Sequence, residues 1–99
     1  MANIAVLGYG TVGSGVVEVL NTNKDRINSK SYEPINIKYV LDLRDFPGDP
    51  VQEIITHDYN DILNDNTIDV VVEVMGGINP AYTFVKQALE SGKSVCTSN

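Results

Sequence analysis

The sequence is poor in cysteine and in basic residues. A single cysteine, Cys96, leaves no disulfide within the chain and no pair of thiolates for a metal, which favours a reducing compartment. Only 7 Lys and Arg residues accompany 13 Asp and Glu residues, so the formal net charge is −6. Because an acidic chain repels a phosphate backbone, this balance argues against nucleic acid as a partner.

Long apolar runs and a basic N-terminal segment are also missing. No apolar run approaches the roughly 18 residues of a membrane span, and Met1 to Asn3 lack the positive charge that begins a secretory signal. Apolar residues still make up 42% of the 99 residues, which is enough for one modest core. We therefore expect one cytoplasmic domain over residues 1–99, without a membrane partner.

Short apolar runs rich in β-branched residues alternate with amphipathic stretches. Strands are predicted at 3–7, 35–41, 69–74 and 94–97, with a short edge strand at 53–56. Helices are predicted at 11–20, 58–63 and 80–91. This alternation indicates an α/β fold, namely a Rossmann-like open parallel sheet with helices on both faces and the strand order 3-2-1-4-5.

Apolar spacing also predicts which side chains face the core. In the first helix the predicted inward stripe is Val12, Val16, Val17 and Leu20. In the last helix Asn79 is the predicted N-cap, and the predicted inward residues are Ala81, Phe84, Val85, Ala88 and Leu89. Cys96 is interpreted as a small core residue and His57 as a surface residue without metal-ligating partners.

A glycine-rich turn follows the first predicted strand and opens the first helix. Gly8, Gly10 and Gly13 fit the pattern G-x-G-x-x-G. In a dinucleotide site the first glycine permits the tight turn, the second lets a pyrophosphate approach the backbone, and the third lets helix and strand pack closely. The alternative is a structural turn without a ligand. The strand-turn-helix context favours dinucleotide binding, and backbone amides would let an acidic chain hold an anion.

Two charged residues end the second predicted strand, where the adenosine ribose arrives in such folds. Asp42 would accept hydrogen bonds from the ribose hydroxyls and favours NAD, whereas Arg44 would pair with a 2′-phosphate and favours NADP. Asp42 follows Gly13 by 29 residues, against about 20 in the usual fingerprint. The polar stretch before Pro34 accounts for the excess as an insertion. The alternative is that both charges are solvated loop residues.

The run Met75-Gly76-Gly77 follows the strongest predicted strand, at the edge of the sheet where ligands of open α/β folds bind. Two glycines allow a ligand to approach the backbone, and they equally suit an ordinary loop. Glu73 lies in an otherwise apolar strand, so its side chain is either buried or directed to solvent at the strand end.

Taken together, these motifs resemble the N-terminal part of homoserine dehydrogenase. The resemblance covers essentially the whole chain and rests on Gly8 to Gly13, Val71 to Gly77, Pro80-Ala81, and Gly92 to Asn99. The family interconverts aspartate 4-semialdehyde and homoserine with NAD(P)H, in amino-acid biosynthesis. Two alternatives remain open at this point: another reductase such as dihydrodipicolinate reductase, and a nucleotide-sensing module without catalysis.

The resemblance implies several residue roles. The amides of Thr11 and Val12 would hold the pyrophosphate, Arg44 would meet a 2′-phosphate, and Gly76 and Gly77 would border the cofactor. Thr97 and Asn99 would approach the nicotinamide. The catalytic lysine, the amino-acid substrate pocket and the dimerising segments of the family follow the position of Asn99. We therefore expect the chain to be an inactive cofactor-binding fragment of a homo-oligomeric enzyme.

Overall fold

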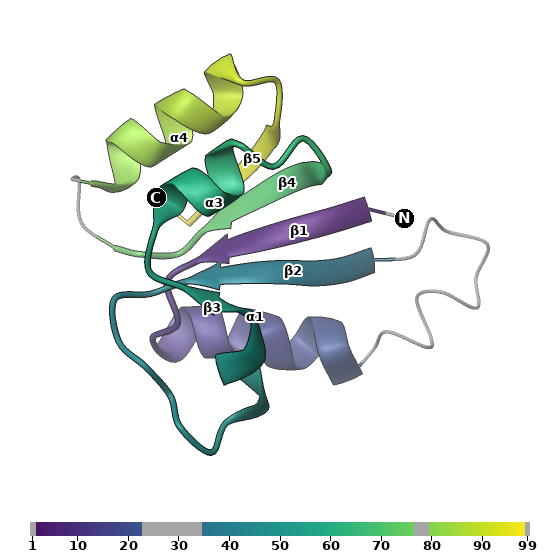
Figure 1. Cartoon of the computed structure of the whole chain (residues 1–99), viewed down its shortest axis with the longest axis vertical. Coiled ribbons are helices and arrows are strands. Elements are labelled where there is room, and N and C mark those ends of the chain that lie inside the picture. Colours follow the sequence, from purple (N-terminus) through teal and green to yellow (C-terminus); the bar gives the residue numbers. More distant parts are fainter. Residues whose placement is uncertain (1, 23–34, 77–79, 99) are drawn as a thin grey trace.

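The computed structural model describes residues 2–22, 35–76 and 80–98, and these build one parallel sheet covered by helices (Figure 1). The strands are β1 (Ala2–Leu7), β2 (Ile35–Leu41), β3 (Ile55–Thr56), β4 (Ile68–Glu73) and β5 (Ser94–Thr97). The helices are α1 (Thr11–Thr22), α3 (Tyr59–Leu63) and α4 (Ala81–Glu90), with a 3₁₀ helix η1 (Pro50–Ile54). The strand order β3-β2-β1-β4-β5 confirms the predicted Rossmann-like topology.

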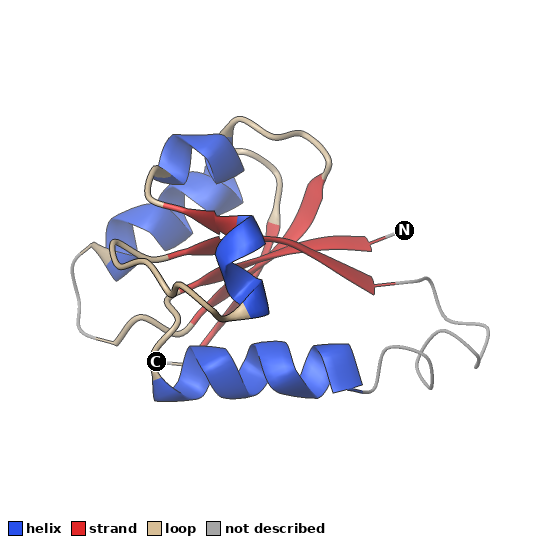
Figure 2. Cartoon of the chain, turned by 60° about the horizontal axis from the view of Figure 1, so that its bottom comes forward, coloured by secondary structure: helices blue, strands red, loops and turns tan. Residues whose placement is uncertain are grey.

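Side chains that alternate along β1 separate two apolar cores. Ile4 and Val6 pack with Val17 of α1 on one face, and Ala5 and Leu7 pack on the other face against α3 and α4. Figure 2 shows α1 below the sheet and the helices α3 and α4 above it. Because both faces of β1 are buried, its sequence is a continuous apolar run.

The start of α1 lies unusually close to the turn that precedes it. A Cβ atom added to Gly13 would lie 2.0 Å from the carbonyl oxygen of Gly8, a distance that no side chain tolerates. Gly8 itself has a φ of 102°, in the region that glycine adopts without a steric penalty. These two glycines therefore fix how α1 leaves β1, which confirms the structural part of the glycine-motif prediction.

The predicted strand at 53–56 is only half correct. Asp49 caps the 3₁₀ helix η1 by accepting a hydrogen bond from the Val51 amide at 2.9 Å, and Pro50 begins the turn. Strand pairing with β2 therefore starts only at Ile55. Val51 points into the α1 core, so η1 closes that face of the sheet.

Several predicted core residues lie at the surface instead. Val12 is 57% exposed because Gly13, its neighbour, is the residue that faces the sheet. Leu89 is also 57% exposed, since α4 buries its small residues Ala81 and Ala88. Cys96 is exposed because β5 pairs with β4 on one side only.

The first residues of α4 also differ from the prediction. Pro80 is the N-cap of α4 and forms no side-chain cap hydrogen bond, and the helix starts at Ala81. The predicted cap, Asn79, lies outside the described residues. His57 is exposed, as predicted. None of the helices in the described ranges is long and apolar enough to cross a membrane.

We predict opposite effects for two alanine substitutions in α1. Gly13→Ala should lower the free energy of unfolding by at least about 2 kcal/mol, because the new methyl group meets the Gly8 backbone. Gly15→Ala is the matched control, since nothing lies within 4 Å of its added Cβ. It should stabilise the protein by about 0.5–1 kcal/mol through helix propensity. Urea unfolding followed by circular dichroism measures both. Equal stability of the two variants would refute the close contact.

Candidate functional site

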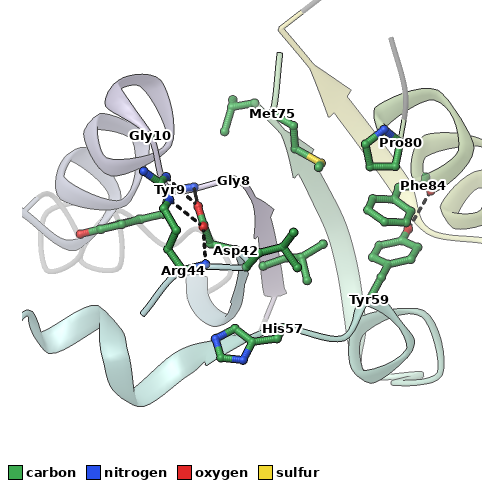
Figure 3. A pocket seen from close by; sticks show the side chains of 13 residues that line it. Gly8, Tyr9, Gly10, Asp42, Arg44, His57, Tyr59, Met75, Pro80 and Phe84 are labelled. Carbon is green, nitrogen blue, oxygen red and sulfur yellow. Dashed lines mark hydrogen bonds and ion pairs between the residues drawn. The ribbon is translucent and has the colours of Figure 1, made fainter. Parts of the chain in front are cut away.

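A pocket of about 460 Å³ opens at the carboxyl ends of β1, β2 and β4 (Figure 3). Its walls come from three places: the glycine turn after β1, the segment that follows β2, and the apolar residues between α3 and α4. Ligands of open α/β sheets bind at this edge, where the strand order reverses. The fold therefore brings together residues that are far apart in the sequence at the expected place.

The glycine turn forms one wall and ends in the start of α1. Gly8 and Gly10 line the pocket, and the Gly10 carbonyl accepts the first hydrogen bond of the helix from the Ser14 amide at 2.9 Å. The first amides of a helix, here those of Thr11 to Gly13, have no partner within the helix and carry its positive dipole end. An added Cβ at Gly10 would have nothing within 4 Å. An anionic group therefore fits against this turn.

Asp42 directs its carboxylate toward the glycine turn from the end of β2. Its Oδ2 atom accepts the Tyr9 amide at 3.0 Å and the Arg44 Nη2 at 3.0 Å, and its Oδ1 atom accepts the Arg44 Nε at 3.0 Å. The hydrogen bonds from the Arg44 side chain are the main cause that lowers the pKa of Asp42 to about 2. The carboxylate is therefore charged at neutral pH, although its side chain is only 10% exposed.

Arg44 stays at the surface while it pairs with Asp42. Its side chain is 62% exposed, and its guanidinium lies 5.2 Å from the centre of the Phe46 ring. Phe46 in turn meets the Tyr9 ring edge-on at 4.8 Å, and the Tyr9 hydroxyl donates to Asp49 at 3.0 Å. These contacts fasten the loop after β2 to the glycine turn. The sequence analysis missed Tyr9, because it occupies a variable position of the motif.

An apolar wall lies opposite the charged pair. The rings of Tyr59 and Phe84 are stacked at 4.1 Å between centres, and the Tyr59 hydroxyl donates to the Phe84 carbonyl at 2.7 Å. Burial raises the pKa of Tyr59 to about 12, so the phenol stays neutral. Met75 and Pro80 also line the pocket. Flat apolar surfaces of this kind suit a planar aromatic group. No local sequence signal predicted the wall, because only the packing of α3 on α4 creates it.

The remaining predicted residues cluster around the end of β4. Glu73 is 1% exposed, and its carboxylate accepts hydrogen bonds from the Met75 amide and the Thr97 hydroxyl. This is the buried alternative of the two that the sequence left open. Gly76 has a φ of 73° and follows Met75, whereas Gly77 and Asn99 lie outside the described residues.

His57 reaches the rim of the pocket, which the sequence did not indicate. Its Nε2 atom lies 2.9 Å from Oδ1 of Asp45, and half of its side chain is exposed. Within the described part of the chain, no three side chains of the metal-ligating kinds come together. The described lining of the pocket thus offers backbone amides, a carboxylate, a guanidinium, the His57 imidazole and an apolar wall.

The chain is similar to known proteins in sequence and in fold. Residues 8–99 match the sequence family described as the NAD-binding domain of homoserine dehydrogenase. Homoserine dehydrogenases from Bacillus subtilis and Lactococcus lactis are 36% and 37% identical to the chain over 97% and 98% of its length. The crystal structure of homoserine dehydrogenase from S. aureus superposes with a TM-score of 0.90 at 42% identity and covers 99% of the chain.

The chain corresponds to about a quarter of each protein that it matches. The chain spans 23% and 24% of the two curated relatives and 26% of the crystallised S. aureus protein. The family model and the similar proteins favour the homoserine dehydrogenase interpretation over a dihydrodipicolinate reductase or a nucleotide-sensing module. A family match of this extent, on a fold and a glycine turn of the expected kind, decides the assignment. The chain belongs to the NAD-binding domain family of homoserine dehydrogenase.

Proposed function

We propose that this chain forms the cofactor-binding domain, residues 1–99, of an enzyme that reversibly reduces aspartate 4-semialdehyde to homoserine with NAD(H) or NADP(H). The observation that carries the proposal is the meeting of the glycine turn and the Asp42–Arg44 pair in one pocket. When bound, the cofactor supplies the hydride acceptor or donor, and the chain supplies the groups that hold it in place.

The glycine turn is the proposed pyrophosphate site. Gly8 and Gly13 hold the turn against the start of α1, Gly10 leaves room for the phosphates, and the amides of Thr11 and Val12 donate to them. This arrangement fits an acidic chain, because backbone dipoles replace the lysines and arginines that a solvent-exposed anion site would need. The open space beside Gly10 supports the proposal directly.

The Asp42–Arg44 pair is the proposed ribose site. With NAD, Asp42 would accept the two ribose hydroxyls, and with NADP, Arg44 would turn from Asp42 to the 2′-phosphate. The apolar wall of Tyr59 and Phe84 lies across the pocket from the pair and would cover the adenine. The guanidinium can pair either with Asp42 or with a 2′-phosphate, so the site suits either cofactor.

The nicotinamide half would extend to the other side of the glycine turn. Gly76 and Gly77 would border it, and Thr97 and Asn99 would approach the ring. The order of the strands supports this direction, because β4 and β5 lie on the side of β1 opposite to β2.

The remaining parts of the activity are proposed for the longer protein. Hydride transfer to aspartate 4-semialdehyde also needs a pocket for the amino and carboxylate groups of the substrate and an acid for the developing alkoxide. We assign these groups, and the contacts of a homo-oligomer, to segments that the relatives have in addition to the matched quarter. The protein would work in the cytoplasm, and the 99 residues alone would bind cofactor without turnover.

Substitution of Gly10 tests the pyrophosphate site. Gly10→Leu should weaken the binding of NADPH and NADH at least about tenfold, because its side chain fills the space assigned to the phosphates. Titration followed by nicotinamide fluorescence measures the affinities. The control Gly15→Ala, within α1, should leave them unchanged. Unaltered affinity in a folded Gly10→Leu variant would show that the pyrophosphate lies elsewhere.

Substitution of Arg44 ranks the two cofactors. Arg44→Ala should weaken NADPH binding about tenfold or more and change NADH binding less than about threefold, since only NADPH has the phosphate that Arg44 would meet. Lys86→Ala removes the same charge from an exposed position of α4 and should affect neither cofactor. An equal loss for NADPH and NADH would contradict the assignment of Arg44 to the 2′-phosphate.

A further inference from the structure

Glu73 is a buried carboxylate in a strand that is otherwise apolar. Oε2 accepts the Met75 amide at 2.7 Å, and Oε1 accepts the Thr97 hydroxyl at 2.5 Å. Removing a carboxylate from water is costly unless donors such as these compensate it. The pairing of β4 with β5 does not need the side chain, because the Ser98 amide already donates to the Glu73 carbonyl at 3.1 Å. Backbone pairing within the sheet therefore does not explain why a carboxylate is buried at position 73.

The segments that Glu73 joins lie beside the glycine turn. The Val74 amide donates to the Leu7 carbonyl at 3.1 Å, directly before Gly8. A Cβ added to Gly8 would lie 3.2 Å from the Cα of Met75, so the two turns are packed against each other. Met75 also lines the pocket. The buried carboxylate is therefore hydrogen-bonded to a residue, Met75, that itself lines the pocket.

The strand order decides which half of a dinucleotide meets this surface. The ribose site at Asp42 follows β2, and the pyrophosphate site follows β1. A dinucleotide has one nucleoside on each side of its pyrophosphate, so the second nucleoside extends away from β2, toward the ends of β4 and β5. Glu73 ends β4, and its register partner Thr97 ends β5.

We propose that Glu73 is a positioning residue for the nicotinamide half of the cofactor and acts through Met75 and Thr97. The proposal rests on the proposed cofactor-binding function. Since Glu73 is 1% exposed, it fixes the two segments rather than touching the ligand. Without the carboxylate, the Met75 amide and the Thr97 hydroxyl lose their common acceptor, and the turn after β4 is no longer tied to the end of β5 by these side-chain bonds.

The test compares a ligand with nicotinamide and a ligand without it. NADH and ADP-ribose share the adenosine and both phosphates, so only NADH reports on the nicotinamide half. Glu73→Leu removes both bonds. Glu73→Gln keeps a similar shape, with an amide oxygen for Met75 and an amide N–H for the Thr97 oxygen. Glu90→Leu makes the same change at an exposed position of α4 and is the control.

We expect Glu73→Leu to weaken NADH at least about tenfold and to reduce its emission enhancement at saturation, while ADP-ribose binding changes less than about threefold. Glu73→Gln should restore NADH binding to within about threefold of the unaltered chain. If Glu73→Leu does not fold, Thr97→Val provides the test, because it removes one of the two bonds at an exposed position and should show the same selective loss of NADH.

Two outcomes would overturn the proposal. One is an equal loss of NADH and ADP-ribose, which would make Glu73 merely structural. The other is unchanged NADH affinity and emission in Glu73→Leu or, where that variant does not fold, in Thr97→Val. An unaltered chain that binds neither ligand would instead refute the proposed function itself, and this result is distinct from the first two.

Discussion

The contact between Gly13 and Gly8 is the constraint on which the rest of the site depends. A carbonyl oxygen occupies the space where any other residue at position 13 would carry its Cβ. This contact sets the start of α1 directly after β1 and aims its first amides at the edge of the sheet. The glycine turn, the end of β2 and the end of β4 then meet around one pocket. The position of the site therefore depends first on this backbone contact and only then on its side chains.

An acidic chain that binds an anionic cofactor must solve an electrostatic problem locally. Its net charge of −6 opposes a phosphate group at long range. The helix start offers backbone dipoles, and Arg44 offers a guanidinium that already neutralises Asp42. The carboxylates near the site are held in hydrogen bonds, as Asp42 is by Tyr9 and Glu73 by Met75. The ion pair of Asp42 and the hydrogen bonds to both carboxylates reduce their repulsion of an anion in the pocket.

The parts of this account that the sequence predicted are those with a local physical signal. Apolar β-branched runs predicted β1, β2 and β4 because both faces of a central strand are buried. The register of α1 was predicted wrongly at Val12, since periodicity alone does not reveal that Gly13 faces the sheet. The stacked rings of Tyr59 and Phe84 had no signal at all, because their contact joins residues 25 positions apart. Tertiary packing creates such features, and local pattern does not encode them.

The central claim is that the pyrophosphate of the cofactor binds to the start of α1. Two-dimensional ¹H–¹⁵N NMR of the chain during a titration with NADPH tests it most directly, because each backbone amide reports separately. We expect the amides of Gly10, Thr11 and Val12 to show the largest saturable shifts and those of Lys86 and Glu90 in α4 to stay unchanged. Saturable binding that leaves the three amides at the glycine turn unshifted would contradict a pyrophosphate site at the start of α1.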